Sequence, residues 1–214
     1  MISLAPLFVS LKISSISVIL TLLLGITLSF FMYQYKGKYK TIIDTIINLP
    51  LVLPPIVVGF SVLMLFGGNA LGKYVDLIFT WKAGILVSVI VTLPFMYRSI
   101  NTSLSHIDYT IIEEAYSCGA NNREIFFYLI LPLIYGGILN GIILAFTRSL
   151  GEFGATLLVC GNIPDKTQTI SSSIYFHIGA GEYNIAGFWV IVISAISFLF
   201  MFLVNRFVKK QEFY

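Results

Sequence analysis

The chain has 214 residues, of which 57% are hydrophobic and only 11% are charged, and its formal net charge is +3. A soluble domain of this length usually carries about 25% charged residues, so there is too little polar surface here to coat a globule of this mass. The composition argues against a cytosolic enzyme or a disordered chain, and the 13 basic residues are too scattered for a nucleic-acid binder. The sequence therefore predicts an integral membrane protein.

Charge-free stretches predict where the chain crosses the bilayer, because a helix needs about 20 apolar residues to span about 30 Å of hydrocarbon. We expect one all-α domain, residues 1–214, with five transmembrane helices. The third is the shortest, since only 15 uncharged residues separate Lys82 from Arg98. A further apolar stretch, 153–164, is interrupted by glycine and is either a re-entrant segment or part of a sixth, irregular span. The expected spans are approximately 10–35, 45–68, 81–100, 125–148 and 183–207.

The lysines and arginines predict the orientation of the chain, because cytoplasmic loops carry an excess of both. Lys36, Lys38 and Lys40 directly follow the first expected span, and the tail at 206–210 is basic as well. We therefore expect the N-terminus outside the cell and the C-terminus in the cytoplasm. The first span is similar to a secretion signal, but its basic cluster follows the apolar run and no cleavage site is evident, so we expect it to be retained.

The segment between the third and fourth spans, 101–124, concentrates polar residues on the cytoplasmic side. Its apolar residues recur at helical spacing, which predicts a short amphipathic helix, and Gly119 supplies a stop with a φ angle open to positive values. A structured insertion of this length is more than a connection between two spans requires. From the residues alone, it is either an interfacial helix lying on the lipid headgroups or a docking surface for a partner.

The loop after the fourth span, 148–182, mixes glycines, hydroxyl groups and a few charges on the opposite side of the membrane. Its glycines allow a sharply turning backbone whose exposed amides can hold an oxyanion. Arg148 is either an interfacial anchor or a cation facing a polar pathway. Glu152 is a poor ligand for an anion, and we expect it to pair with Arg148 or to cap a backbone. The glycines concerned are Gly151, Gly154 and Gly161.

Prolines and small residues predict irregular, closely packed spans. A proline removes a backbone donor and bends a helix, and in lipid the freed carbonyl groups need partners inside a bundle or a cavity. Gly137 and Gly141, four residues apart, favour close helix contact, and we expect Asn140 to hydrogen-bond to a neighbouring helix rather than to line a path. The prolines that fall inside expected spans are Pro50, Pro54, Pro55, Pro94 and Pro132.

Chemistry that the sequence lacks also bounds the function. His106 and His177 are expected on opposite sides of the membrane and cannot share a metal, and Cys118 and Cys160 form no paired metal motif. There is no nucleophile–base arrangement, no phosphate-binding loop and almost no ionisable side chain within the spans. We therefore expect no catalytic site, no metal, no cofactor and an energy source on another chain. A lipid-modifying intramembrane enzyme and a membrane scaffold are the alternatives outside transport.

Glu113, Ala115 and Gly119, followed by Leu131–Pro132, resemble the EAA signature of ABC-importer permeases. Glu114 stands at the middle alanine of that signature and a leucine stands at its isoleucine, while the spacing is intact. In that family the segment, here 106–124, is the coupling helix that inserts into a groove of the ATP-hydrolysing subunit. The residues that this resemblance implies for coupling are Asp108, Glu113, Glu114, Ala115, Gly119, Ala120 and Arg123.

Three further stretches, 49–60, 79–100 and 148–175, resemble the molybdate-importer permeases, and the last is the most specific. Together with the signature, the resemblance extends from about residue 10 to residue 207. Tungstate and sulfate/thiosulfate permeases are close relatives that match less well, and they remain the alternatives within transport. The residues that we expect either at an outer gate or simply in the folding of the outer loop are Arg148, Gly151, Glu152, Phe153, Gly154, Thr156, Asn162 and Gln168.

The resemblance implies a type I ABC importer permease, a homodimer with one path at its two-fold axis in a bacterial or archaeal cell (inner) membrane. It also implies two ATPase subunits on the cytoplasmic side and an extracytoplasmic binding protein that delivers the oxyanion. Because a doubly charged oxyanion in hydrocarbon costs on the order of tens of kcal/mol, the path must be hydrated or lined by donors. The spans offer almost no cations, so we expect a weakly interacting, gated path and specificity in the binding protein.

Overall fold

The computed structural model describes residues 3–68 and 76–211, and within these ranges every regular element is a helix. Among the described residues, three helices are long and apolar enough to cross a membrane: α1 (Ala5–Gln34), α4 (Trp81–Ser105) and α11 (Tyr183–Gln211). Two bent helix pairs raise the number of spans to as many as five if each pair counts as one.

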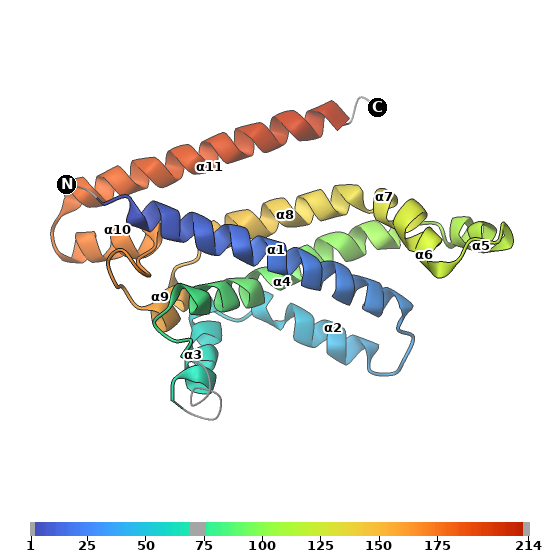
Figure 1. The fold of residues 1–214 in the computed structure, drawn as a ribbon, viewed down its shortest axis with the longest axis horizontal. Helices are drawn as coiled ribbons and strands as arrows, with labels where there is room; N and C mark the ends of the chain where they lie inside the picture. The colour runs from blue at the N-terminus through green and yellow to red at the C-terminus, as the bar shows by residue number, and fades with distance from the viewer. Residues whose placement is uncertain (1–2, 69–75, 212–214) are drawn as a thin grey trace.

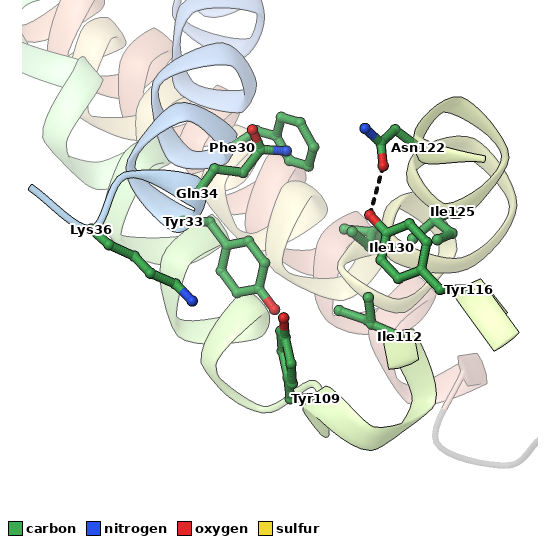
Figure 2. A pocket seen from close by; sticks show the side chains of 10 residues that line it. All are labelled: Phe30, Tyr33, Gln34, Lys36, Tyr109, Ile112, Tyr116, Asn122, Ile125 and Ile130. Carbon is green, nitrogen blue, oxygen red and sulfur yellow. Dashed lines mark hydrogen bonds between the residues drawn. The ribbon is translucent and has the colours of Figure 1, made fainter. Parts of the chain in front are cut away.

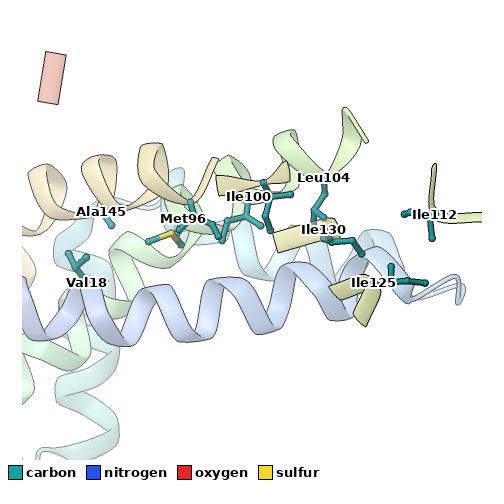
Figure 3. Close-up of a cluster of buried hydrophobic side chains, with 10 residues drawn as sticks. Val18, Met96, Ile100, Leu104, Ile112, Ile125, Ile130 and Ala145 are labelled. Carbon is teal, nitrogen blue, oxygen red and sulfur yellow. The ribbon is translucent and has the colours of Figure 1, made fainter. Parts of the chain in front are cut away.

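The centre of the fold is α4, which packs between α1 and α8 (Tyr135–Leu150). Figure 3 shows the apolar cluster at this junction, with Val18 from α1, Met96 from α4 and Ala145 from α8. Of the residues in the most apolar stretch of each helix, 72% are buried in α4, 33% in α1 and 6% in α11. α4 remains one helix through Pro94, so the interruption expected there is wrong. The side chain of Pro94 is fully buried, and the packing around it keeps the helix continuous.

A row of hydroxyl side chains holds α1 against α4. The Oγ1 atoms of Thr21 and Thr92 share a hydrogen bond of 2.9 Å, and Ser17 Oγ donates to the carbonyl oxygen of Ile85 at 3.4 Å. In lipid, small polar residues allow helices to approach closely and to bond to each other, while Leu20, Leu23 and Leu24 of the same helix are exposed. The buried hydroxyl residues of α1 are Ser10, Ser14, Ser17, Thr21 and Ser29.

Two glycines bring α8 against α4, as their four-residue spacing predicted. A Cβ on Gly137 would lie 2.8 Å from the carbonyl oxygen of Ser99, and one on Gly141 would lie 2.5 Å from Met96 Sδ. Asn140, between the glycines, donates from Nδ2 to Ser99 Oγ at 3.1 Å, which confirms the predicted hydrogen bond to a neighbouring helix.

We expect Gly137→Ala to destabilise the protein, because the new methyl group has no space between α8 and α4, and such overpacking costs about 1–3 kcal/mol. Gly136→Ala is the matched control, since its Cβ would meet nothing within 4 Å. Thermal unfolding of both variants in detergent measures the difference. Equal midpoints for Gly137→Ala and Gly136→Ala would contradict this close packing.

The second expected span, 45–68, is not a straight helix. α2 (Lys40–Asn48) continues into the 3-10 turn η1 (Leu49–Leu51), and α3 (Pro55–Phe66) leaves at an angle of 106°. Pro54 is extended, with ψ 135°, as residues that precede a proline prefer, and α3 begins with the proline that follows. The span expected at 45–68 is therefore a bent pair of short helices, which either crosses the membrane as one broken span or forms a re-entrant loop.

The fourth expected span, 125–148, is bent by 63° where α7 meets α8. It begins with α6 (Asn122–Glu124), continues as the π-helical stretch η2 (Ile125–Ile130) and α7 (Leu131–Leu133), and then turns into α8. Pro132 lies at this junction and lacks the N–H that a continuous α-helix would use, which accounts for the irregular hydrogen bonding around it.

The helices run between two ends of the bundle (Figure 1). α1, α4 and α11 start at one end, beside α9 (Gly154–Cys160) and α10 (Ile170–Gly179), and we call this the N-terminal end. α5 (Tyr109–Ser117) and the last turns of α11 lie at the other, the C-terminal end. The two polar regions of the sequence, 101–124 and 148–182, are thus at opposite ends.

Candidate functional site

The predicted coupling segment at the C-terminal end contains a short capped helix. α5 begins after Asp108, whose carboxylate accepts a hydrogen bond from the Thr110 backbone N–H at 3.0 Å. This bond lowers the pKa of Asp108, so the cap is intact at neutral pH and is lost only as the pH falls through that lowered pKa. Ile112 is the buried residue of α5, and it joins the same apolar cluster as Ile125 (Figure 3).

Gly119 ends this helix in a left-handed conformation with φ +86°, as the sequence allowed. The Ala120 N–H donates to the Ala115 carbonyl oxygen at 3.1 Å, and the Gly119 N–H donates to that of Tyr116 at 2.9 Å. These two bonds form a Schellman motif. A capping box at Asn121–Glu124 then starts α6. The turn between α5 and α6 is therefore fixed by the Schellman motif on one side and by the capping box on the other.

The predicted coupling residues differ in exposure. Ala115 and Ala120 are half-buried and pack against the apolar cluster, so they hold the segment to the bundle. The remaining ones are exposed, and neither glutamate of the signature forms an ion pair within the described part of the chain. They leave polar, mainly acidic groups on a surface that a partner can reach. These exposed residues are Asp108, Glu113, Glu114, Gly119 and Arg123.

A cavity of about 610 Å³ lies between this segment and the end of α1 (Figure 2). Tyr33 of α1 and Tyr109 of α5 point their hydroxyl groups toward each other across it, and Tyr116 Oη donates to Asn122 Oδ1 at 2.6 Å. Sequence reasoning missed this cavity, because its walls come from helices that are far apart in the chain. The cavity thus separates part of the coupling segment from the end of α1.

At the N-terminal end, a buried ion pair connects α8 to α9. Arg148 Nη1 lies 2.7 Å from Glu152 Oε2, and the other carboxylate oxygen of Glu152 accepts from the Ala155 backbone N–H at 3.0 Å. Glu152 is only 4% exposed. It therefore pairs with Arg148 and caps α9, the two alternatives that its sequence context predicted. Both oxygens are engaged within the chain, so Glu152 offers no free acceptor to a passing ligand.

The glycines of this region differ in what they do. Gly151 has φ −87° in the turn that follows α8, and Gly154 is the first residue of α9, so neither uses the positive φ angles that glycine allows. Gly161 alone of the three is left-handed, at φ +65°, where it ends α9. α9 has seven residues and spans about 10 Å, so the apolar stretch 153–164 is too short to cross the bilayer. It packs as a buried short helix against α3 and α4.

The other predicted gate residues mainly pack against side chains of the same chain. Thr156 is buried beside Ser14 and Glu152 at a cavity of about 10 Å³, and the Phe153 ring lies 5.2 Å from that of Tyr175. Asn162 and Gln168 are half-buried in the loop between α9 and α10. The structure thus groups Arg148, Glu152 and Thr156, and these contacts help to fold the N-terminal end of the bundle.

Titratable and thiol groups elsewhere are dispersed. No group of three or more His, Cys, Asp or Glu side chains converges within residues 3–68 and 76–211. His106 follows α4 at the C-terminal end, whereas His177 lies in α10, with Nδ1 2.6 Å from Glu182 Oε2. Cys118 is exposed and Cys160 is buried.

Comparison with known proteins identifies relatives over almost the whole chain. Residues 21–212 match the family model described as the binding-protein-dependent transport system inner membrane component. The molybdenum transport system permease protein ModB of Escherichia coli K12 is 37% identical, with 86% of this chain and 85% of that protein covered. ModB of Haemophilus influenzae is 36% identical, covering 94% and 93%. The sulfate transport system permease protein CysT of Escherichia coli K12 is 30% identical, covering 85% and 68%.

Solved structures with the same fold are ABC transporters. The MetNI methionine transporter in an inward-facing conformation superposes with a TM-score of 0.77 at 15% identity, covering 95% of this chain and 93% of that chain. A bacterial transporter involved in the import of the polysaccharide alginate reaches 0.81 at 18% identity, covering 97% and 79%. At these identities the likeness concerns the fold, which is that of an importer permease.

Proposed function

The chain belongs to the family of binding-protein-dependent transport system inner membrane components, and on that premise we propose that it is the molybdate-conducting permease of an ATP-driven importer. The observation that carries the cargo assignment is the identity of 36–37% to molybdenum permeases over most of both chains. The sulfate permease is less similar and longer, which makes sulfate the weaker alternative. The chain is a transport subunit, and ATP hydrolysis resides on a separate subunit.

The partners follow from the two ends of the bundle. An ATPase subunit docks on α5 at the C-terminal end, where the exposed acids of the signature have no ion-pair partner among the described residues. An external oxyanion-binding protein docks at the N-terminal end, beside α9 and α10. A second copy of the chain completes the path at a two-fold axis, so two ATPases serve one dimer. The lysines that follow α1 support a cytoplasmic C-terminal end.

Force applied to α5 has a continuous route across the membrane. α5 follows α4 directly and continues through α6 and η2 into α8, and α4 and α8 pack tightly at Gly137 and Gly141. α8 ends at the Arg148–Glu152 pair, which is joined to α9. When nucleotide binding closes the ATPase pair, the two coupling segments approach each other, and α4 and α8 carry that motion to the N-terminal end.

Anion-dependent ATP hydrolysis in the assembled complex tests this function. The permease, its ATPase and its binding protein are reconstituted in proteoliposomes, and hydrolysis and uptake are measured with molybdate, tungstate or sulfate. We expect molybdate-loaded binding protein to stimulate both hydrolysis and uptake. Sulfate should be at least about tenfold less effective, since a buried binding site on the binding protein can discriminate ligands by that factor. A preference for sulfate would overturn the cargo assignment. Hydrolysis that is indifferent to every oxyanion would favour a scaffold.

A further inference from the structure

Arg98 is an exposed cation on the most buried helix of the bundle. It lies 17 residues beyond Trp81, or about 25 Å along α4, which places it near the C-terminal boundary of a hydrocarbon layer about 30 Å thick that begins at Trp81. Between Lys82 and Arg98 no residue of α4 is exposed. A charged side chain at this position extends to the membrane interface or faces a water-filled cavity or a partner rather than lipid.

The position of Arg98 is fixed from the side of α2. Arg98 Nε donates to Asn48 Oδ1 at 2.8 Å, and Asn48 Nδ2 in turn donates to the Asp44 carbonyl oxygen at 2.8 Å. The carboxylate of Asp44 is engaged elsewhere, since it accepts from Tyr97 Oη at 2.8 Å. No carboxylate forms an ion pair with Arg98 in the described ranges. The charge of the guanidinium is therefore not neutralised by a carboxylate, and its Nη groups remain available to another acceptor.

A second polar side chain approaches the same stretch of α4 from α8. Asn140 is exposed, and it bonds through Nδ2 to Oγ of Ser99, the residue next to Arg98. Through this bond Asn140 lies level with Ser99, and so at the same end of α4 as Arg98. An exposed amide that faced hydrocarbon there would leave polar atoms without partners, at a cost in free energy. Thr102, one turn beyond Arg98 on the same face of α4, is exposed as well and continues the polar surface.

We propose that Arg98 and Asn140 form a weak anion station in the cytoplasmic half of the path, with Asn48 as the residue that positions the guanidinium. The inference rests on the proposed oxyanion transport and adds where the dianion is held. Arg98 supplies the single positive charge and two paired N–H donors suited to two oxygens of a tetrahedral oxyanion. One exposed cation without a second is a weak site, and weak binding lets the cargo leave toward the cytoplasm.

Transport by charge variants of the assembled complex tests the station. Arg98→Gln should lower molybdate uptake about tenfold or more, because a charge-assisted hydrogen bond is lost, and Arg98→Lys should retain part of the rate. Arg206→Gln, which removes an exposed arginine from α11, is the matched control and should transport within about twofold of the unaltered complex. If Arg98→Gln transports as well as Arg206→Gln, the station does not exist. If the unaltered complex moves no molybdate, the proposed function fails instead.

A labelling measurement separates the station from a folding defect. Cys118→Ser removes the exposed thiol, Cys160 is buried, and Thr102→Cys places a new thiol one turn from Arg98. The measured quantity is the rate at which an anionic methanethiosulfonate reacts with this thiol, divided by the rate for a cationic one. This ratio should be roughly tenfold higher when Arg98 is present than in the same protein carrying Arg98→Gln. An unchanged ratio, or no reaction with either charged reagent, would overturn the proposal.

Discussion

Replacing Gly119 by valine is expected to uncouple ATP hydrolysis from molybdate uptake. Gly119 has φ +86° at the Schellman turn that ends α5, and a β-branched residue is strongly disfavoured there. No atom lies within 4 Å of the missing Cβ, so the effect comes from the backbone and not from a clash. Strain of about 1–3 kcal/mol redirects the turn between α5 and α6, and we expect uptake to fall at least about tenfold while basal hydrolysis persists.

Two further variants identify the cause of that loss. Gly119→Asn should retain much of the uptake, because asparagine tolerates the left-handed region. Gly181→Val imposes the same conformational conflict at φ +77°, also in open space, but at the N-terminal end. It should leave the ratio of uptake to hydrolysis unchanged. Normal coupling in Gly119→Val would mean that this turn does not transmit force.

Removing one partner of the Arg148–Glu152 pair is expected to produce the largest loss of stability. Glu152 is 4% exposed, so Arg148→Ala leaves an uncompensated carboxylate in the protein interior, at a cost of about 3 kcal/mol or more. Glu152→Ala also removes the acceptor for the Ala155 N–H, and with it the cap of α9. The N-terminal end should then lose its order first, because α9 is anchored there.

Thermal unfolding of detergent-purified variants checks this order of effects. Glu152→Gln retains an oxygen for the Ala155 N–H and should be milder than Glu152→Ala. Arg148→Met combined with Glu152→Gln removes both charges and should recover part of the stability that Arg148→Ala loses. A double variant that is less stable than Arg148→Ala would show that the charge pair is not what holds α8 to α9.

The sequence was informative where the controlling chemistry is local. The conformation of Gly119, the engagement of Glu152 and the interhelical bond of Asn140 all follow from neighbours within a few residues or from the spacing on one helix. The prolines predicted that the second span would bend, but the 106° corner depends on how α3 packs against α9. Pro94 shows the converse, since the packing of α1 and α8 keeps α4 continuous there.

Contacts between helices that are distant in the chain could not be predicted from the sequence alone. The cavity beside Tyr33 and Tyr109 joins two helices from different parts of the chain, and no local pattern marks it. The bond from Arg98 to Asn48 likewise depends on the turn that brings α2 beside α4. One signal was present and unused: from Ser10 to Thr21 the buried hydroxyl residues of α1 recur every three to four residues, a spacing that marks a face packed on another helix in lipid.

The side of the membrane on which the coupling segment lies tests the account most directly, and the chain carries its own probe. Cys118 is exposed at the end of α5, and Cys160 is buried. A membrane-impermeant maleimide should label the unaltered protein in inside-out vesicles and not in right-side-out vesicles, and Cys118→Ser should abolish the signal. Labelling in right-side-out vesicles alone would place α5 outside the cell, where no ATPase could act on it, and would contradict the proposed coupling.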